Sequence, residues 1–169
     1  MLTNTTSPPV PRTVCNGPVL EFDFPAFQIG VAEYEEGPTG CTVFYFPEGA
    51  ATAVDIRGGY PGTVHNYEWN HALCLAGGSL YGLEAAYGVM TEIFARKEYS
   101  VEDFALVSGA IIYDYGVRAN RIHPDKALGQ AALRAARARS ATMGGTILDN
   151  PRIIDARVRR YLERARLRY

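Results

Sequence analysis

The clearest chemical feature of the sequence is the turn Gly77-Gly78-Ser79, which follows an apolar run and precedes a segment with helical spacing. Two glycines allow a sharp turn, and a helix start offers unpaired N–H groups to an anion or an oxyanion. The turn resembles a nucleophile elbow, G-x-S-x-G, but Tyr81 replaces its last glycine and Gly82 comes one position late. Two interpretations stay open: the turn binds substrate or an oxyanion, or Ser79 only caps the helix, which is the commoner case.

A serine nucleophile would need a histidine base that is held by a carboxylate. The chain has three histidines, His65, His71 and His123. The one catalytic trio to consider is Ser79 with His71 and either Asp55 or Asp114. The spacing does not favour this trio over chance, and a structural role for His71 at the end of a strand is more typical. The sequence contains no HExxH, no GxxxxGK[ST] and no well-placed GxGxxG motif, so we expect no metal and no cofactor.

Tyr113 comes at the end of the apolar segment ALVSGAII, where side chains emerge from a strand into a cleft. A phenol at such a position can donate a hydrogen bond to a carbonyl or an oxyanion. The alternative is a tyrosine that anchors the rim of a sheet. Sequence alone leaves both interpretations open.

The elements that position these residues are predicted to be strands first and helices later. The segments VLEFDF, FQIGVAEYE, CTVFYFP and TAVDIRGG are β-branched and aromatic, which predicts three or four strands. ALCLA and ALVSGAII predict two more strands, with an amphipathic helix from Ser79 between them. HPDKALGQAALRAARAR predicts a second helix. The predicted fold class is therefore α+β, with helices layered on a sheet.

Composition divides the chain of 169 residues into three parts. Residues 1–18 predict an extended leader, and residues 19–139 predict one α/β domain. The net charge is −8 over residues 1–130 and +7 over residues 131–169, so residues 140–169 predict a divergent, basic, arginine-rich helical tail. Its arginines do not alternate with aromatic residues, so we expect no nucleic-acid binding.

The sequence predicts a soluble, cytoplasmic protein that does not bind membranes. It has no apolar run of the length that crosses a bilayer, and its first residues lack the pattern of a secretory signal. The cysteines Cys15, Cys41 and Cys74 match no zinc or redox spacing. We expect all three to be reduced and buried.

Several stretches together resemble one family from about Phe22 to Leu133. They are similar to the N-terminal half of the α-subunit region of endo-type nylon-oligomer (6-aminohexanoate-oligomer) hydrolases, which group with the DmpA-type and β-peptidyl aminopeptidases. The resemblance implies part of a four-layer αββα sandwich of the DmpA and ornithine-acetyltransferase type. The stretches are FDFPAFQIGVAEYEEGPTGCTV, TAVDIRGGYPG, NHALCLAGGSLYGLEAAYGV, LVSGAIIYDYG and PDKALGQAAL.

The resemblance also implies an N-terminal-nucleophile mechanism. In such enzymes a precursor cleaves itself before a Thr or Ser, whose hydroxyl then attacks an amide carbonyl. The family places the tyrosine that matches Tyr113 beside this nucleophile. The nucleophile, an assisting lysine and an asparagine would follow the second helix, where TMGGTILDNP does not match the family pattern. We therefore expect a truncated hydrolase that is inactive alone.

Two alternatives remain. A separately encoded C-terminal chain completes a split hydrolase that acts on a small amide or peptide-like substrate, or the chain is a non-catalytic protein that binds a small molecule or an anion at Gly77-Gly78-Ser79. A sheet without its remaining strands exposes an edge and an apolar face. We therefore also expect self-association into a homo-oligomer.

Overall fold

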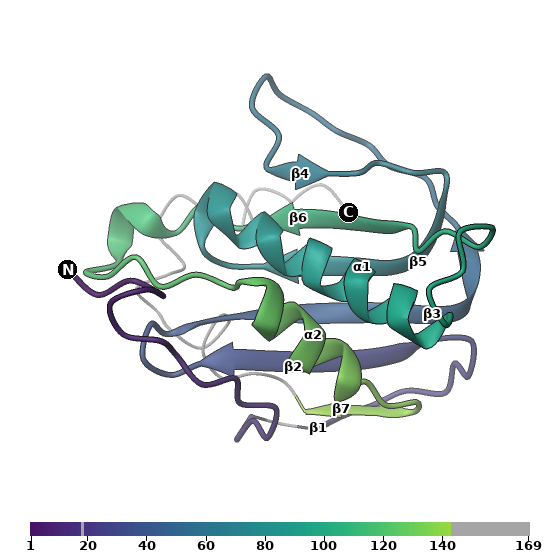
Figure 1. Ribbon diagram of the computed structural model, residues 1–169, viewed down its shortest axis with the longest axis horizontal. Coiled ribbons are helices and arrows are strands. Elements are labelled where there is room, and N and C mark those ends of the chain that lie inside the picture. The colour runs from purple at the N-terminus through teal and green to yellow at the C-terminus, as the bar shows by residue number, and fades with distance from the viewer. Residues whose placement is uncertain (18, 143–169) are drawn as a thin grey trace, which may run out of the picture.

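The structure, a computed structural model, describes residues 1–17 and 19–142. Its main sheet has five strands in the order β2-β3-β5-β6-β4 (Figure 1). β5 and β6 are parallel, and the other neighbouring pairs are antiparallel. The strands are β2 (Gln28–Tyr34), β3 (Thr39–Ala51), β4 (Thr63–Val64), β5 (Trp69–Ala76) and β6 (Val107–Ile111).

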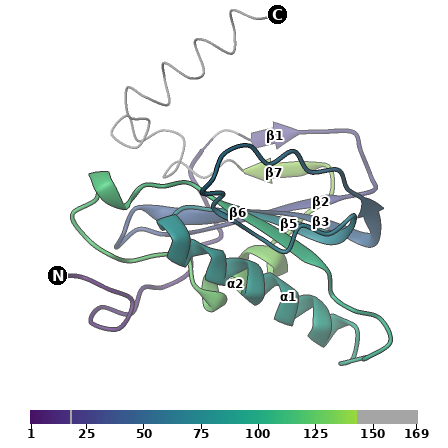
Figure 2. The same ribbon diagram turned by 90° about the horizontal axis from the view of Figure 1, so that it is seen from above.

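Two helices, α1 (Glu84–Arg96) and α2 (Lys126–Arg134), lie side by side on one face of this sheet (Figure 2). A separate antiparallel pair of short strands, β1 (Val19–Glu21) and β7 (Ser140–Thr142), lies on the other side near β2. A mixed sheet with two helices confirms the α+β fold class that the order of the elements predicted.

The hydrophobic core lies between the sheet and the two helices. Alternate side chains of a strand point to the same face, so every second residue of β5 faces the helices. Cys41 and Cys74 belong to this core, and the three thiols are free and buried as expected. The other central members of the core are Val43, Ala72, Ala76, Ala86, Val89, Ile93, Val107, Leu128 and Leu133.

The two helices contact each other through glycines. A Cβ atom added at Gly129 of α2 would lie 2.0 Å from the carbonyl oxygen of Ala85 in α1. A Cβ atom added at Gly88 of α1 would lie 2.2 Å from the carbonyl oxygen of Lys126 in α2. The backbones of α1 and α2 are therefore in direct contact, and no side chain fits between them at these two points.

The opposite face of the sheet is partly open. Leu75 lies between Cys74 and Ala76, which face the helices, so its half-exposed side chain points away from them. Phe44 of β3 contacts Phe27, which also stacks on Phe22. Among the described residues, this aromatic group and the β1–β7 pair lie at the β2 end of the face, and Leu75 of β5 stays about half exposed.

The segment that was predicted as an extended leader lies against the domain. The Asn4 amide nitrogen donates to the His123 carbonyl and to the Asp125 carboxylate, both at 2.9 Å. The Asn4 side-chain oxygen accepts from the His123 N–H at 2.9 Å. Arg12 pairs with Glu33 of β2 through backbone hydrogen bonds in both directions. Residues 1–17 are thereby tied to β2 and to the start of α2.

One predicted element differs from the structure, and another lies outside the described residues. TAVDIRGG is not a strand: β3 ends at Ala51, and Gly58 has a φ of +104°, which ends any extended conformation. The predicted arginine-rich helix lies outside the described residues, apart from the short strand β7. Among residues 1–17 and 19–142, no helix has the length and apolar character needed to span a membrane.

Candidate functional site

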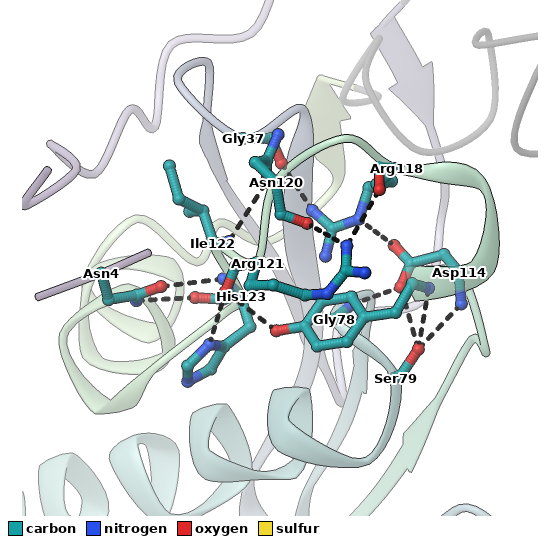
Figure 3. Close-up of polar contacts among 11 residues, drawn as sticks. Asn4, Gly37, Gly78, Ser79, Asp114, Arg118, Asn120, Arg121, Ile122 and His123 are labelled. Carbon is teal, nitrogen blue, oxygen red and sulfur yellow. Dashed lines mark hydrogen bonds and ion pairs between the residues drawn. The ribbon is translucent and has the colours of Figure 1, made fainter. Parts of the chain in front are cut away.

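Ser79 lies directly after β5 and connects two loops (Figure 3). Its buried hydroxyl accepts hydrogen bonds from the backbone N–H groups of Asp114 at 3.0 Å and Tyr115 at 2.9 Å. Asp114 and Tyr115 follow β6, the parallel neighbour of β5. The hydroxyl of Ser79 therefore fixes the loop after β6 against the turn after β5.

The prediction that Ser79 caps a helix is wrong. A 3-10 helix, η1 (Ser79–Leu83), begins at Ser79 itself, and α1 begins only at Glu84. Gly78 occupies the N-cap position with a φ of 83°, a conformation that glycine adopts without strain. The Ser79 hydroxyl accepts from the loop after β6, so it makes no bond to an N–H group of the helix.

The backbone N–H groups of the Gly77-Gly78-Ser79 turn all have partners within the chain. Gly77 donates to the carbonyl of Gly40 at 3.0 Å, and Ser79 donates to that of Ile112 at 3.2 Å. Gly78 donates to the Asp114 carboxylate at 3.0 Å. The Asp114 carboxylate thus occupies the turn, and a substrate oxyanion would have to displace it from the Gly78 N–H. The predicted binding role of Gly77, Gly78 and Ser79 stays a prediction.

Asp114 also forms a buried ion pair with Arg118 (Figure 3). Arg118 Nε lies 3.2 Å from Asp114 Oδ2, and the two side chains are only 4% and 3% exposed. The Arg118 guanidinium donates to the carbonyl of Gly37 at 2.7 Å and lies 4.9 Å from the centre of the Tyr115 ring. Burial lowers the pKa of Arg118, and the Asp114 carboxylate opposes this shift. Both oxygens of Asp114 are therefore engaged, one by Gly78 and one by Arg118.

Tyr113, the predicted catalytic residue, immediately precedes this ion pair. Its side chain is 79% exposed. The backbone is held on both sides, because Ile112 donates to the carbonyl of Ala76 at 2.9 Å and Asp114 is bonded to Ser79. The structure therefore presents the Tyr113 side chain to solvent from a fixed stretch of backbone beyond β6, and its catalytic role stays a prediction.

The predicted trio of His71 with Asp55 or Asp114 is wrong. His71 lies near the start of β5, whereas Asp114 follows the end of the parallel strand β6, so the two lie at opposite ends of the sheet. Asp55 pairs with Arg57 on the exposed stretch after β3. The partners of His71 are Lys97, whose Nζ lies 2.9 Å from Nε2, and the backbone N–H of Leu106, 3.3 Å from Nδ1.

The buried position of His71 predicts a pH effect on stability. Burial lowers the pKa of His71, Lys97 lowers it further, and Asp103 partly opposes them. The unfolded chain then takes up a proton first as the pH falls below the ordinary histidine pKa of about 6.5. The stabilising contribution of neutral His71 is therefore complete above about pH 6.5 and is lost as the pH falls toward the folded-state pKa.

We expect His71→Gln to reduce the dependence of the unfolding free energy on pH between about 7 and 5. Glutamine retains a polar group near Lys97 but does not titrate. Urea unfolding of both proteins at several pH values measures the difference. Equal slopes for the two proteins would show that His71 is not buried in its neutral form.

Sequence reasoning did not identify Arg118 or Lys97. The only signal for Arg118 was its spacing of four residues from Asp114, which predicts a contact where the chain between them is helical. Asp114 and Arg118 are the N-cap and C-cap residues of a short 3-10 helix, η2 (Tyr115–Val117), which was not predicted from the sequence. Lys97 follows α1 and had no distinguishing motif. Within the part of the chain that the structure describes, no group of three or more His, Cys, Asp or Glu residues is arranged to hold a metal ion.

Comparison with known proteins identifies relatives of this chain, although no family model matches it. It is 54% identical over 120 residues to a putative NylC-analogous protein of Agromyces sp. (strain KY5R), across 70% of this chain and 39% of that protein. A 6-aminohexanoate-oligomer endohydrolase of the same strain is also 54% identical over 120 residues, which is 34% of its length. An uncharacterized aminopeptidase of Mycobacterium tuberculosis (strain H37Rv) is 38% identical over 108 residues, across 57% of this chain and 31% of that protein.

These relatives define a class of hydrolases that comprises nylon-oligomer hydrolases and aminopeptidases. Over about 70% of its length this chain is similar to the 6-aminohexanoate-oligomer endohydrolases, and over 57% of its length it is similar to the aminopeptidase. The resemblance inferred from the ordered sequence stretches is confirmed. The chain spans little more than a third of the length of the relatives that are 54% identical to it.

Proposed function

We propose that this chain forms the N-terminal part of an N-terminal-nucleophile-type amide hydrolase and is inactive alone. The observation that carries the proposal is the 54% identity to a 6-aminohexanoate-oligomer endohydrolase over only 34% of that enzyme. In the proposed reaction, a Thr or Ser hydroxyl from outside the matched part attacks an amide carbonyl, the amine leaves, and water hydrolyses the ester. The substrate class is a peptide or a 6-aminohexanoate oligomer.

In this proposal Tyr113 acts at the reacting amide. Its exposed phenol is free to donate a hydrogen bond to the oxyanion that forms at the carbonyl. The bonds that hold Ile112 and Asp114 fix the backbone on both sides of Tyr113, and in this proposal the bound substrate would orient the phenol itself. Gly78 and Ser79 hold the loop after β6 in place, and Gly77, Gly78 and Ser79 bind substrate directly only if the Asp114 carboxylate leaves Gly78.

The open face of the sheet supports completion by further polypeptide. Both helices cover one face of the sheet (Figure 2). Leu75 of β5, which points away from the helices, and Ile112 just after β6 both have exposed apolar side chains. Contiguous exposed apolar surface is typical of a site that another layer covers. A second sheet at this face would give the four-layer αββα sandwich. We propose that a separately encoded chain provides this layer or, in its absence, that copies of this chain associate through the same face.

Complementation tests the proposed function. We expect the purified chain to release no amine from linear 6-aminohexanoate oligomers, and we expect activity when it is co-expressed with the part of the Agromyces enzyme that has no counterpart here. In the active mixture, Tyr113→Phe should lower kcat at least about 100-fold, the usual effect of removing an oxyanion donor. Tyr60→Phe, at another exposed tyrosine, is the matched control and should retain activity.

Two outcomes would contradict this proposal. Activity of the chain alone that is lost in Ser79→Ala would indicate a serine hydrolase of the elbow type. Stabilisation by small anions in a thermal-shift assay, without turnover in any mixture, would favour the alternative of a non-catalytic binding protein that uses the Gly77-Gly78-Ser79 turn.

A further inference from the structure

A second polar cluster lies at the far end of α1 from Ser79. There the surface forms a hollow of about 400 Å³ beside the start of β5 and the loop that joins α1 to β6. Its lining includes Trp69, His71, Lys97, Asp103, Phe104 and Glu48. None of these residues takes part in the proposed hydrolase site, so a ligand site in this hollow does not depend on the proposed function.

Lys97 provides a fixed positive charge in this hollow. It follows the last turn of α1, its side chain is only 16% exposed, and its Nζ lies 2.9 Å from His71 Nε2. The ammonium also contacts the Asp103 carboxylate, which itself lies 4.0 Å from His71 Nε2. Lys97, which His71 holds in place, therefore already binds a carboxylate, the one that the chain supplies.

The carboxylate of Asp103 is replaceable. Its side chain is 59% exposed and comes from the loop after α1, whereas Lys97 and His71 are largely buried. Because the Asp103 side of this ion pair is open to solvent, its carboxylate regains water when it leaves Lys97, and an outside carboxylate can take its place. Lys97 stays held by His71 when Asp103 leaves.

Two aromatic side chains give the hollow an apolar wall. Trp69 is about half exposed, and Phe104 is more exposed than that. The Trp69 indole is fixed against the backbone, because a Cβ atom at Gly49 would lie 2.2 Å from its Nε1. Glu48 also lines the hollow and disfavours a second negative charge.

We propose that this hollow binds a small organic monocarboxylate that carries an apolar chain. The ligand carboxylate takes the place of the Asp103 carboxylate on Lys97, and the chain lies against Trp69 and Phe104. A free carboxylic acid with an apolar chain and the carboxyl end of a short oligomer of such units both present a carboxylate followed by an apolar chain. A distal ammonium group, as in an ω-amino acid, faces Glu48 favourably.

Trp69 is the only tryptophan of the chain, so its fluorescence reports directly on the hollow. We expect hexanoate to give a saturable change at constant ionic strength, and hexanamide, which has the same chain without the charge, to give none. 6-Aminohexanoate and its linear dimer distinguish the free acid from the end of an oligomer. Hexylamine, which lacks the carboxylate, should give no change.

Two variants test the assigned contacts in opposite directions. Lys97→Met keeps most of the aliphatic stem and should weaken hexanoate binding about tenfold or more, because it removes a charge-assisted hydrogen bond. Asp103→Asn removes the internal competitor and should strengthen binding severalfold. The proposal would be overturned if hexanoate gave no saturable fluorescence change in both the natural chain and Asp103→Asn. Unchanged hexanoate binding in a folded Lys97→Met protein would also overturn it.

Discussion

Replacing Asp114 with alanine is expected to lower the free energy of unfolding by about 3–5 kcal/mol, the range for removing one partner of a buried ion pair. The change leaves the Arg118 guanidinium buried without its counter-charge. It also removes the acceptor of the Gly78 N–H. Urea denaturation followed by circular dichroism measures the loss.

A matched exposed pair provides the control for Asp114→Ala. Asp55 and Arg57 form an ion pair of similar length that is open to solvent, so Asp55→Ala should change the unfolding free energy by no more than about 0.5 kcal/mol. The double change Asp114→Leu with Arg118→Met removes both buried charges and should recover part of the loss. A small effect of Asp114→Ala would mean that water reaches Arg118 in solution.

Gly129→Ala is expected to destabilise the protein by about 1–3 kcal/mol, although alanine favours a helix over glycine by about 1 kcal/mol. The added methyl group would lie 2.0 Å from the Ala85 carbonyl oxygen, so α1 and α2 must move apart. Backbone atoms form this contact, and they cannot rotate away as a side chain can. Thermal and urea unfolding give the change in stability.

Gly116→Ala is the control for this prediction, because a Cβ atom at Gly116 has no neighbour within 4 Å. Gly116→Ala should change the free energy of unfolding by no more than about 0.5 kcal/mol. If Gly129→Ala were instead stabilising, helix propensity would dominate and the close contact between α1 and α2 would be looser than the structure shows.

The sequence predicted most of the elements because apolar periodicity is a local property. ALCLA and ALVSGAII became the parallel strands β5 and β6, and Asp125 caps α2 by accepting from the Leu128 N–H at 3.0 Å. TAVDIRGG failed for a nonlocal reason. Its composition suits a strand, but the chain offers it no complete partner, and Gly58 turns the backbone away.

The candidate site was harder to predict because its contacts join distant segments. The Gly77-Gly78-Ser79 turn was recognisable, but the partners of Ser79 lie 35 and 36 residues further along the chain. No local pattern indicates that Asp114 fills the turn or that Arg118 neutralises it. The His71 trio failed because β5 and β6 run parallel, which puts His71, near the start of β5, and Asp114, after the end of β6, at opposite ends of the sheet. Residue types alone do not show the relative direction of two strands.

The bonds of Asn4 set an order of events during synthesis. Its partners, His123 and Asp125, lie 119 and 121 residues further along the chain. Asn4 is therefore made well before the surface that it contacts, whereas Arg12 meets its partner Glu33 after only a short further stretch of chain. Contacts between segments so far apart in sequence are expected to form late, so those of Asn4 stabilise the finished fold.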